Sequence, residues 1–257
     1  MRIHALPLAQ ILPALGLLGS LSLATPCQAA DLTVSAAVSL SNAFRALAAR
    51  FEAEHADTHV LLNFAASDAL LAQITKGAPV DVFASADQDT MDKAATRQLI
   101  DPASRENFVR NRLVLITPLP GGLRLKSLAD LSLPEVHHLV MGRPEGVPAG
   151  RYARAALQEI GLWPALESRT IFAQNVRQAL DYVVRGEVEA GFVYATDAAL
   201  QVDRVQVAFE VPTGRPITYP VAAIAGSPQP VLARQFIHFL ASPSSQAILA
   251  GFGFEKP

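Results

Sequence analysis

The sequence predicts an α/β fold of two lobes, each a mostly parallel sheet flanked by helices, with a ligand cleft between the lobes. After residue 30, short apolar runs alternate with amphipathic helical stretches. Such alternation is typical of parallel strands joined by helices that cover both faces of a sheet. The alternation falls into two separate stretches, and residues 31–257 are long enough to form two modest domains.

The first thirty residues are predicted to be a secretory signal peptide that is removed. Arg2 gives a positive start, and residues 11–24 are apolar and uncharged. Small residues at Cys27 and Ala29 favour cleavage after Ala29, although cleavage after Ala30 is the alternative. A membrane anchor is less well supported, because the apolar run is shorter than the ~20 residues that span a bilayer.

Removal of this segment would also remove Cys27, the one cysteine of the sequence. The mature chain is therefore expected to have no disulfide and no cysteine metal site. A lipid anchor on Cys27 is disfavoured by Pro26 directly before it. The formal net charge of −2 predicts no bulk attraction for nucleic acid, so a bound anion would need local, directed groups.

The elements of the first stretch follow from apolar spacing. Phe44, Leu47 and Phe51 recur at helical intervals, and Gly77 suits the end of a second helix. The predicted strands are 32–36, 59–64 and 80–85, and the predicted helices are 41–54, 68–76 and 88–98.

The second stretch begins at a predicted strand over 112–117, which Pro118 ends. Val176, Leu180 and Val183 lie on one helical face, and Gly186 suits the cap of that helix. The other predicted strands are 139–142, 170–172, 190–193 and 219–225, and the predicted helices are 151–160, 176–185, 230–240 and 244–250. We expect lobe 1 to comprise 31–110 and 221–257, and lobe 2 to comprise 111–220.

Small or hydroxyl residues occupy five predicted junctions between a strand and a helix. A helix start has unpaired backbone N–H groups and a partial positive charge, so several of them aimed at one point form an anion site without lysine or arginine. Each residue alone has an ordinary explanation, as a helix cap, a loop residue or a core aromatic, but their joint occurrence favours a site. The junctions are 36–42, 64–68, 84–87, 147–151 and 174–177.

The motifs at these junctions carry a family resemblance over the whole mature chain. They are AAVSLSNAF (36–44), FAASDALLAQI (64–74), GAPVDVFASADQDTMD (77–92), GRPEGVPAGRYARAAL (142–157), NVRQAL (175–180), GFVYATDA (191–198) and YPVAAI (219–224). With them the chain resembles the periplasmic molybdate-binding proteins of molybdate ABC importers, which are type II periplasmic solute-binding proteins.

The resemblance implies a set of donors to the oxygen atoms of molybdate, none of which is a direct metal ligand. The implied residues are Ser39 and Ser67 through hydroxyl and amide, Ala86, Ala149 and Val176 through amides, and Tyr194 through its hydroxyl. Ser39, Ser67 and Ala86 would come from lobe 1, and the other three residues from lobe 2. A ligand bound to both lobes would draw them together.

Three residues depart from the family pattern. Asp68 follows Ser67, and we expect its carboxylate to cap the next helix and point away from the anion. Asn175 stands where the family commonly has an acidic residue, and Thr196 where it often has glycine or another small residue. Neither change affects an implied donor. Arg151 and Arg177 lie beside implied contacts, and we expect both to face outward from their helices.

The resemblance further implies a membrane permease of the ABC type as partner, tungstate as an equally good ligand, and no cofactor. We expect a periplasmic monomer. A hydrolase is the first alternative, but Ser39 has no GxSxG around it and His137 and His138 are adjacent rather than at metal-ligand spacing. The second alternative is a receptor for sulfate or for a small organic anion, for which an arginine clamp is usual.

Overall fold

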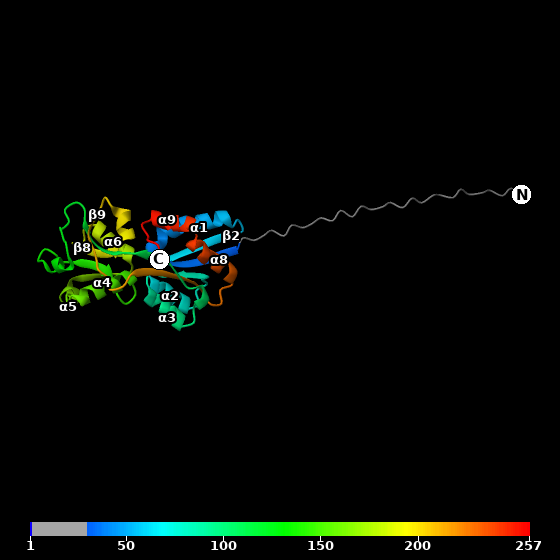
Figure 1. Cartoon of the computed structure of the whole chain (residues 1–257), viewed down its shortest axis with the longest axis horizontal. Coiled ribbons are helices and arrows are strands. Elements are labelled where there is room, and N and C mark those ends of the chain that lie inside the picture. Colours follow the sequence, from blue (N-terminus) through cyan, green and yellow to red (C-terminus); the bar gives the residue numbers. More distant parts are fainter. Residues whose placement is uncertain (2–29) are drawn as a thin grey trace.

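The computed structural model describes Met1 and residues 30–257, arranged in two lobes (Figure 1). The predicted signal peptide therefore lies almost wholly outside the described residues. Each lobe contains one five-stranded sheet flanked by helices. The expected α/β fold class is confirmed, and in the described part of the chain no helix is long and apolar enough to cross a membrane.

The first lobe contains a sheet with the strand order β2-β1-β3-β10-β4. Its strands are β1 (Ala30–Ala37), β2 (Thr58–Ala65), β3 (Val82–Ala84), β4 (Glu106–Asn111) and β10 (Ile217–Ala223). β1 pairs parallel with β2 and β3, whereas β10 pairs antiparallel with β3 and β4.

Two apolar clusters cover the two faces of this sheet. The helices of the lobe are α1 (Ser41–Glu54), α2 (Ser67–Thr75), α3 (Gln88–Thr96), α8 (Pro230–Ala241) and α9 (Pro243–Gly251). α1, α8 and α9 form one layer, in which the rings of Phe51 and Phe236 meet edge to face with centroids 5.1 Å apart (Figure 1). α2 and α3 form the other layer, around Leu70 and Met91.

The second lobe repeats this arrangement with the strand order β7-β6-β8-β5-β9. Its strands are β5 (Leu113–Pro118), β6 (Leu139–Gly142), β7 (Thr170–Ala173), β8 (Ala190–Tyr194) and β9 (Val205–Glu210), and its helices are α4 (Pro148–Glu159), α5 (Trp163–Leu166), α6 (Val176–Val184) and α7 (Ala195–Ala198). β6 pairs parallel with β7 and β8, whereas β5 pairs antiparallel with β8 and β9.

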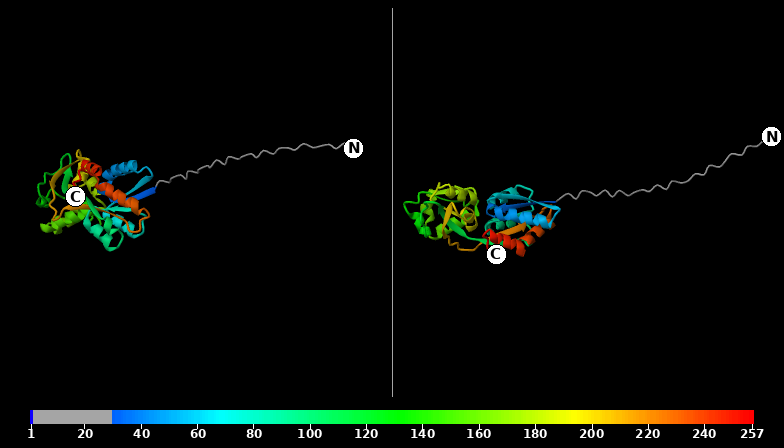
Figure 2. Two further views of the ribbon diagram at one scale, coloured as in Figure 1. Left: turned by 45° about the vertical axis from the view of Figure 1, so that its right-hand side comes forward. Right: turned by 90° about the horizontal axis from the view of Figure 1, so that it is seen from above.

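The reversed strand in each sheet is the one that enters directly from the other lobe. β5 follows β4 after the single residue Arg112, and β10 follows β9 after a short link (Figure 2). Each of these strands runs antiparallel to both of its neighbours in the sheet that it joins. Arg112, the residue between β4 and β5, forms an ion pair with Glu210 at the end of β9 at 3.0 Å. It forms a second ion pair with Glu255 near the C-terminus at 2.9 Å.

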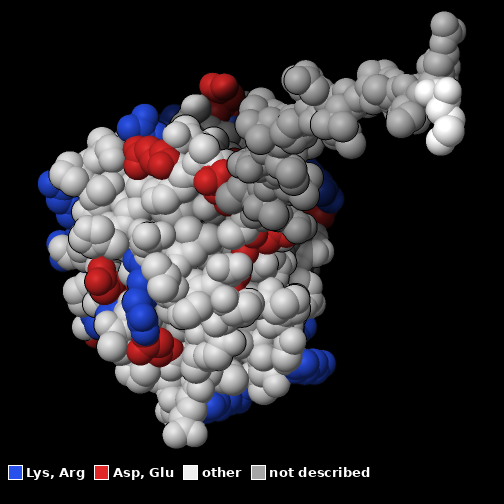
Figure 3. All heavy atoms as spheres, turned by 90° about the vertical axis from the view of Figure 1, so that its right-hand side faces the viewer, with Lys and Arg blue, Asp and Glu red and all other residues white. Residues whose placement is uncertain are grey.

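The surface at the outer end of the first lobe carries lysine, arginine, aspartate and glutamate side chains interspersed (Figure 3). This distribution on the visible face agrees with the small net charge of the sequence. Neither sign of charge dominates on the visible part of this end.

Candidate anion site between the lobes

All six implied contact residues line one small cavity between the lobes. It leaves only about 10 Å³ for the centre of a water-sized sphere, so its own lining nearly fills it. Its lining residues are Ala37, Val38, Ser39, Ala65, Ala66, Ser67 and Ala86 from lobe 1, and Val147, Pro148, Ala149, Val176 and Tyr194 from lobe 2. The lining carries no charged side chain.

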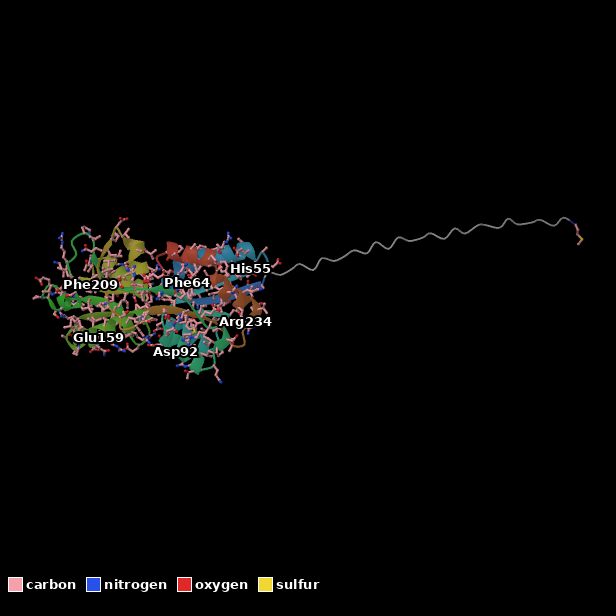
Figure 4. The ribbon with its side chains drawn as sticks, viewed as in Figure 1. His55, Phe64, Asp92, Glu159, Phe209 and Arg234 are labelled. Carbon is pink, nitrogen blue, oxygen red and sulfur yellow. The ribbon has the colours of Figure 1, made fainter. Side chains whose placement is uncertain are left out.

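The carboxyl ends of the parallel strands point toward this cavity. In Figure 4, His55 marks the chain just before β2 on the outer side of lobe 1, and Phe64 near the end of β2 lies closer to lobe 2. This edge of an α/β sheet is where ligands bind, because helix starts and connecting loops converge there.

Three of the six implied donors lie at the start of an α-helix. Ser67 is the first residue of α2, Ala149 is the second residue of α4, and Val176 is the first residue of α6. The first backbone N–H groups of a helix have no partner within the helix and carry a partial positive charge. Asn175 caps α6 through a bond from the Gln178 N–H at 3.0 Å, so replacement of the family's acidic residue leaves the cap intact.

Close backbone packing sets the start of α4. A Cβ atom added to Gly150 would lie 1.8 Å from the carbonyl oxygen of Gly142, at the end of β6. The glycine is thus required by the close approach of helix and strand, and this approach places the amide of Ala149 at the cavity.

The hydroxyl and amide groups of three lining residues lie within reach of one another. The Ala86 N–H donates to the Ser67 Oγ at 3.0 Å, and the Tyr194 hydroxyl donates to the Ala86 carbonyl oxygen at 3.4 Å. Tyr194 comes from lobe 2 and the other two from lobe 1, so donors of both lobes converge on a single small volume. Burial raises the pKa of the Tyr194 hydroxyl, which therefore stays protonated and able to donate at neutral pH.

Tyr219 belongs to the surroundings of the site and was not among the predicted contacts. Its hydroxyl lies 3.1 Å from the Ser39 Oγ and accepts a bond from the Asn111 Nδ2 at 3.2 Å. Asn111 also donates to the Thr196 Oγ1 at 2.9 Å, so Thr196 takes part in the same buried network. Tyr219 opens the YPVAAI motif, which was the signal available in the sequence.

The expectation that Arg151 faces outward is wrong. Arg151 lies on α4 of lobe 2, and its guanidinium contacts Asp68 and Asp87 of lobe 1 at 2.7 Å each. The expectation for Asp68 is wrong in part, because Ala66 holds the cap position of α2 and Asp68 instead pairs with Arg151 and with Lys93 at 2.8 Å. The carboxylate is thereby neutralised by two cations.

Arg177 also crosses between the lobes, contrary to expectation. Its Nε donates to Asp197 Oδ1 at 2.5 Å within lobe 2, and its Nη1 donates to Asn42 Oδ1 of lobe 1 at 3.1 Å. Its Nη2 donates to the backbone carbonyl of Ser39 at 3.4 Å. Arg151 and Arg177 thus lie beside the cavity without lining it, and neither forms an arginine clamp in it.

The hydrolase alternative finds little support in this geometry. The hydroxyl of Ser39 lies beside Tyr219 and has no histidine partner among the hydrogen bonds of the described residues. Within residues 30–257 there is also no group of three or more histidine, cysteine, aspartate or glutamate side chains placed to hold a metal ion. Among the described residues, the hydrogen-bond partner of the Ser39 hydroxyl is thus a tyrosine rather than a general base.

The ion pairs of Asp68 predict a measurable pH dependence. Burial raises the pKa of Asp68, but the Lys93 hydrogen bond and the charge of Arg151 outweigh it, so the pKa lies below the ordinary 3.8. An acid with a lowered pKa stabilises the fold when ionised, and this contribution is lost as the pH falls through its folded-state value. Asp68→Asn should therefore lower the unfolding temperature at about pH 7 and do so much less at about pH 3. Thermal unfolding of the two proteins over this range measures the gap, and a gap independent of pH would contradict the assignment.

Comparison with known proteins reveals extensive similarity. Residues 32–255 match the family model described as "Bacterial extracellular solute-binding protein". The chain is 37% identical over 228 residues to the molybdate-binding protein ModA of Escherichia coli, covering 87% of this chain and 88% of the relative. It is 33% identical over 230 residues to ModA of Haemophilus influenzae, covering 88% and 90%.

Solved structures give the same result at the level of the fold. The periplasmic molybdate-binding protein of Azotobacter vinelandii superposes with a TM-score of 0.75 at 25% identity, covering 88% of this chain and 99% of that one. The substrate-binding domain of a putative molybdenum ABC transporter from Clostridium difficile gives 0.69 at 33% identity, covering 89% and 99%. The sulfate-binding protein SubI of Mycobacterium tuberculosis gives 0.78 at 16% identity, covering 88% and 87%, and this likeness shows the shared fold alone.

Proposed function

The chain belongs to the family of bacterial extracellular solute-binding proteins, and on that premise we propose that it binds molybdate in the periplasm for uptake by an ABC importer. The proposal includes export through a cleaved signal peptide, delivery to a permease in the inner membrane, action as a monomer, and no catalytic step. The names of its relatives from Escherichia coli and Haemophilus influenzae support the choice of ligand.

One observation carries the proposal. Ser39, Ser67, Ala86, Ala149, Val176 and Tyr194 come from six separate segments and two lobes, yet all six line a single cavity. A cavity with amide and hydroxyl donors, in which the serine and tyrosine hydroxyls provide directed bonds, suits the oxygen atoms of one tetrahedral anion.

The balance of donors and acceptors favours a fully deprotonated ion. Hydrogen bonds to a charged oxygen contribute about 1.5–3 kcal/mol each, and a protonated phosphate would bring an O–H group with few acceptors to receive it. Tungstate is nearly isosteric with molybdate, so the proposed site should bind both about equally. Sulfate differs chiefly in size, and its rejection depends on the radius at which the donors converge.

A panel of sodium salts tests this proposal by thermal unfolding. Molybdate at about 100 times its dissociation constant should stabilise the folded protein by about 2.7 kcal/mol. For a chain of this size the unfolding temperature should then rise by roughly 5–10 °C. Tungstate should act similarly, and sodium chloride at equal ionic strength is the control.

The opposite pattern of stabilisation would overturn the proposed ligand. If sulfate or phosphate raises the unfolding temperature and molybdate does not, the chain is a receptor for another oxyanion. Turnover of an ester or phosphoester that Ser39→Ala abolishes would instead support the enzyme alternative.

A further inference from the structure

Ion pairs join the two lobes on one side of the cavity. Arg151, which lies two residues after Ala149, places its Nε 2.8 Å from Asp87 Oδ2 and its Nη2 2.7 Å from Asp68 Oδ2. Asp68 and Asp87 directly follow Ser67 and Ala86, which line the cavity. Each charged residue of this cluster is therefore next to, or two residues from, a proposed donor.

These acidic neighbours pose an electrostatic problem for an anion site. Asp87 is 1% exposed and Asp68 is 18% exposed, so solvent screens their charges only partly. Two unpaired carboxylates at this place would repel a dianion. Arg151, itself 15% exposed, pairs with both carboxylates, and Lys93 pairs with Asp68, so that two cations balance two anions.

Two other arginines that contact the opposite lobe differ from Arg151. Arg177 has its carboxylate partner Asp197 in its own lobe and reaches lobe 1 only through the neutral acceptors Asn42 and Ser39. Arg215 pairs with Asp89 at 2.7 Å, but both side chains are exposed and exposed pairs contribute little.

We propose that Arg151 is a positioning residue for anion capture, which holds the start of α4 against lobe 1 and neutralises Asp68 and Asp87 so that the cavity accepts a dianion. This inference rests on the proposed function. Arg151 would raise the affinity for the anion in two ways. It holds the two lobes together, and it neutralises the carboxylates that lie beside the proposed donors.

Calorimetric titration with sodium molybdate tests the inference on the mature protein. Arg151→Gln should weaken binding about tenfold, within the range usual for coupling between neighbouring groups. Adding Asp68→Asn to Arg151→Gln should recover at least about threefold, because one repelling carboxylate is then gone. A residue needed only for folding would show no such recovery.

Arg154→Gln is the matched control. Arg154 lies on the same helix and pairs with Glu145 of its own lobe at 2.9 Å, so its replacement should leave the affinity for molybdate unchanged. Arg151→Lys keeps the charge without the fork of donors and should bind more tightly than Arg151→Gln. It also provides the measurement if Arg151→Gln does not fold.

The outcomes separate this inference from the proposed function. Failure of the wild-type protein to bind molybdate or tungstate would overturn the proposed function. Tight binding by the wild type together with unchanged affinity in Arg151→Gln, or a loss that Asp68→Asn does not relieve, would overturn the role of Arg151 alone.

Discussion

Ser67→Asp is expected to lower the affinity for molybdate at least about 1000-fold while the protein stays folded. Ser67 is fully buried at the cavity, and its Oγ accepts the Ala86 N–H at 3.0 Å. A carboxylate about 4 Å from a dianion is repelled by about 8 kcal/mol at an effective dielectric constant near 20. Protonation would relieve this repulsion, but at about pH 7 it costs about 4 kcal/mol, which corresponds to about a 1000-fold loss.

The same substitution should lower the unfolding temperature without ligand, because the new carboxylate is buried without a cation and lies near Asp68 and Asp87. Two features of the site offset part of this cost. The new carboxylate would lie at the start of α2, where it can accept the Ala86 N–H and where the helix end favours negative charge. Calorimetric titration and thermal unfolding together therefore separate loss of binding from loss of structure.

Ser67→Asn is the control for size. It adds a neutral group of nearly the same shape, so it should weaken binding by less than the charged substitution. Equal losses for the two variants would mean that filling the cavity, rather than its electrostatic character, decides the affinity, and the proposed dianion site would need revision.

Val176→Pro is expected to weaken molybdate binding roughly 10- to 150-fold, the value of one hydrogen bond to a charged oxygen. Val176 is the first residue of α6, a position where proline is well tolerated because its N–H has no helical partner. The preceding Asn175 is extended, with φ −160° and ψ 171°, which is compatible with a following proline. The change therefore removes the proposed backbone donor and little else.

Val176→Ala is the matched variant, because it shortens the side chain and keeps the amide. Its affinity for molybdate should stay within a few-fold of wild type, and titration of both variants measures the difference. If the proline variant binds as well as the alanine variant, the Val176 amide does not contact the ligand. A loss of the same size in both would assign the effect to side-chain packing.

Local sequence determined much of the architecture. Apolar spacing located α1 and α6, because residues three or four apart lie on one helical face. It did not locate β4 or β9, which are partly exposed and contain polar or charged residues within the strand. The reversed direction of β5 and β10 also went unpredicted, since strand direction depends on which neighbour the strand meets across the lobes.

The candidate site divides in the same way. Small and hydroxyl residues at strand-to-helix junctions indicated the regions that meet at the cavity, whereas the choice of the six particular residues came from the family resemblance. Their role as ligands remains a proposal that the titrations above test. The convergence of these residues is a fact of the folded structure, in which segments from both lobes meet.

The sequence alone thus indicated where a strand gives way to a helix through small or hydroxyl residues, since that pattern depends on a few neighbouring residues. Only the tertiary structure decided which partners the charged residues near the site contact. Arg151 meets Asp87 across 64 positions, and Ser39 meets Tyr219 across 180. Such pairs depend on how two lobes pack, and a buried charge takes the partner that packing brings within reach, because leaving it unpaired costs far more than any local preference.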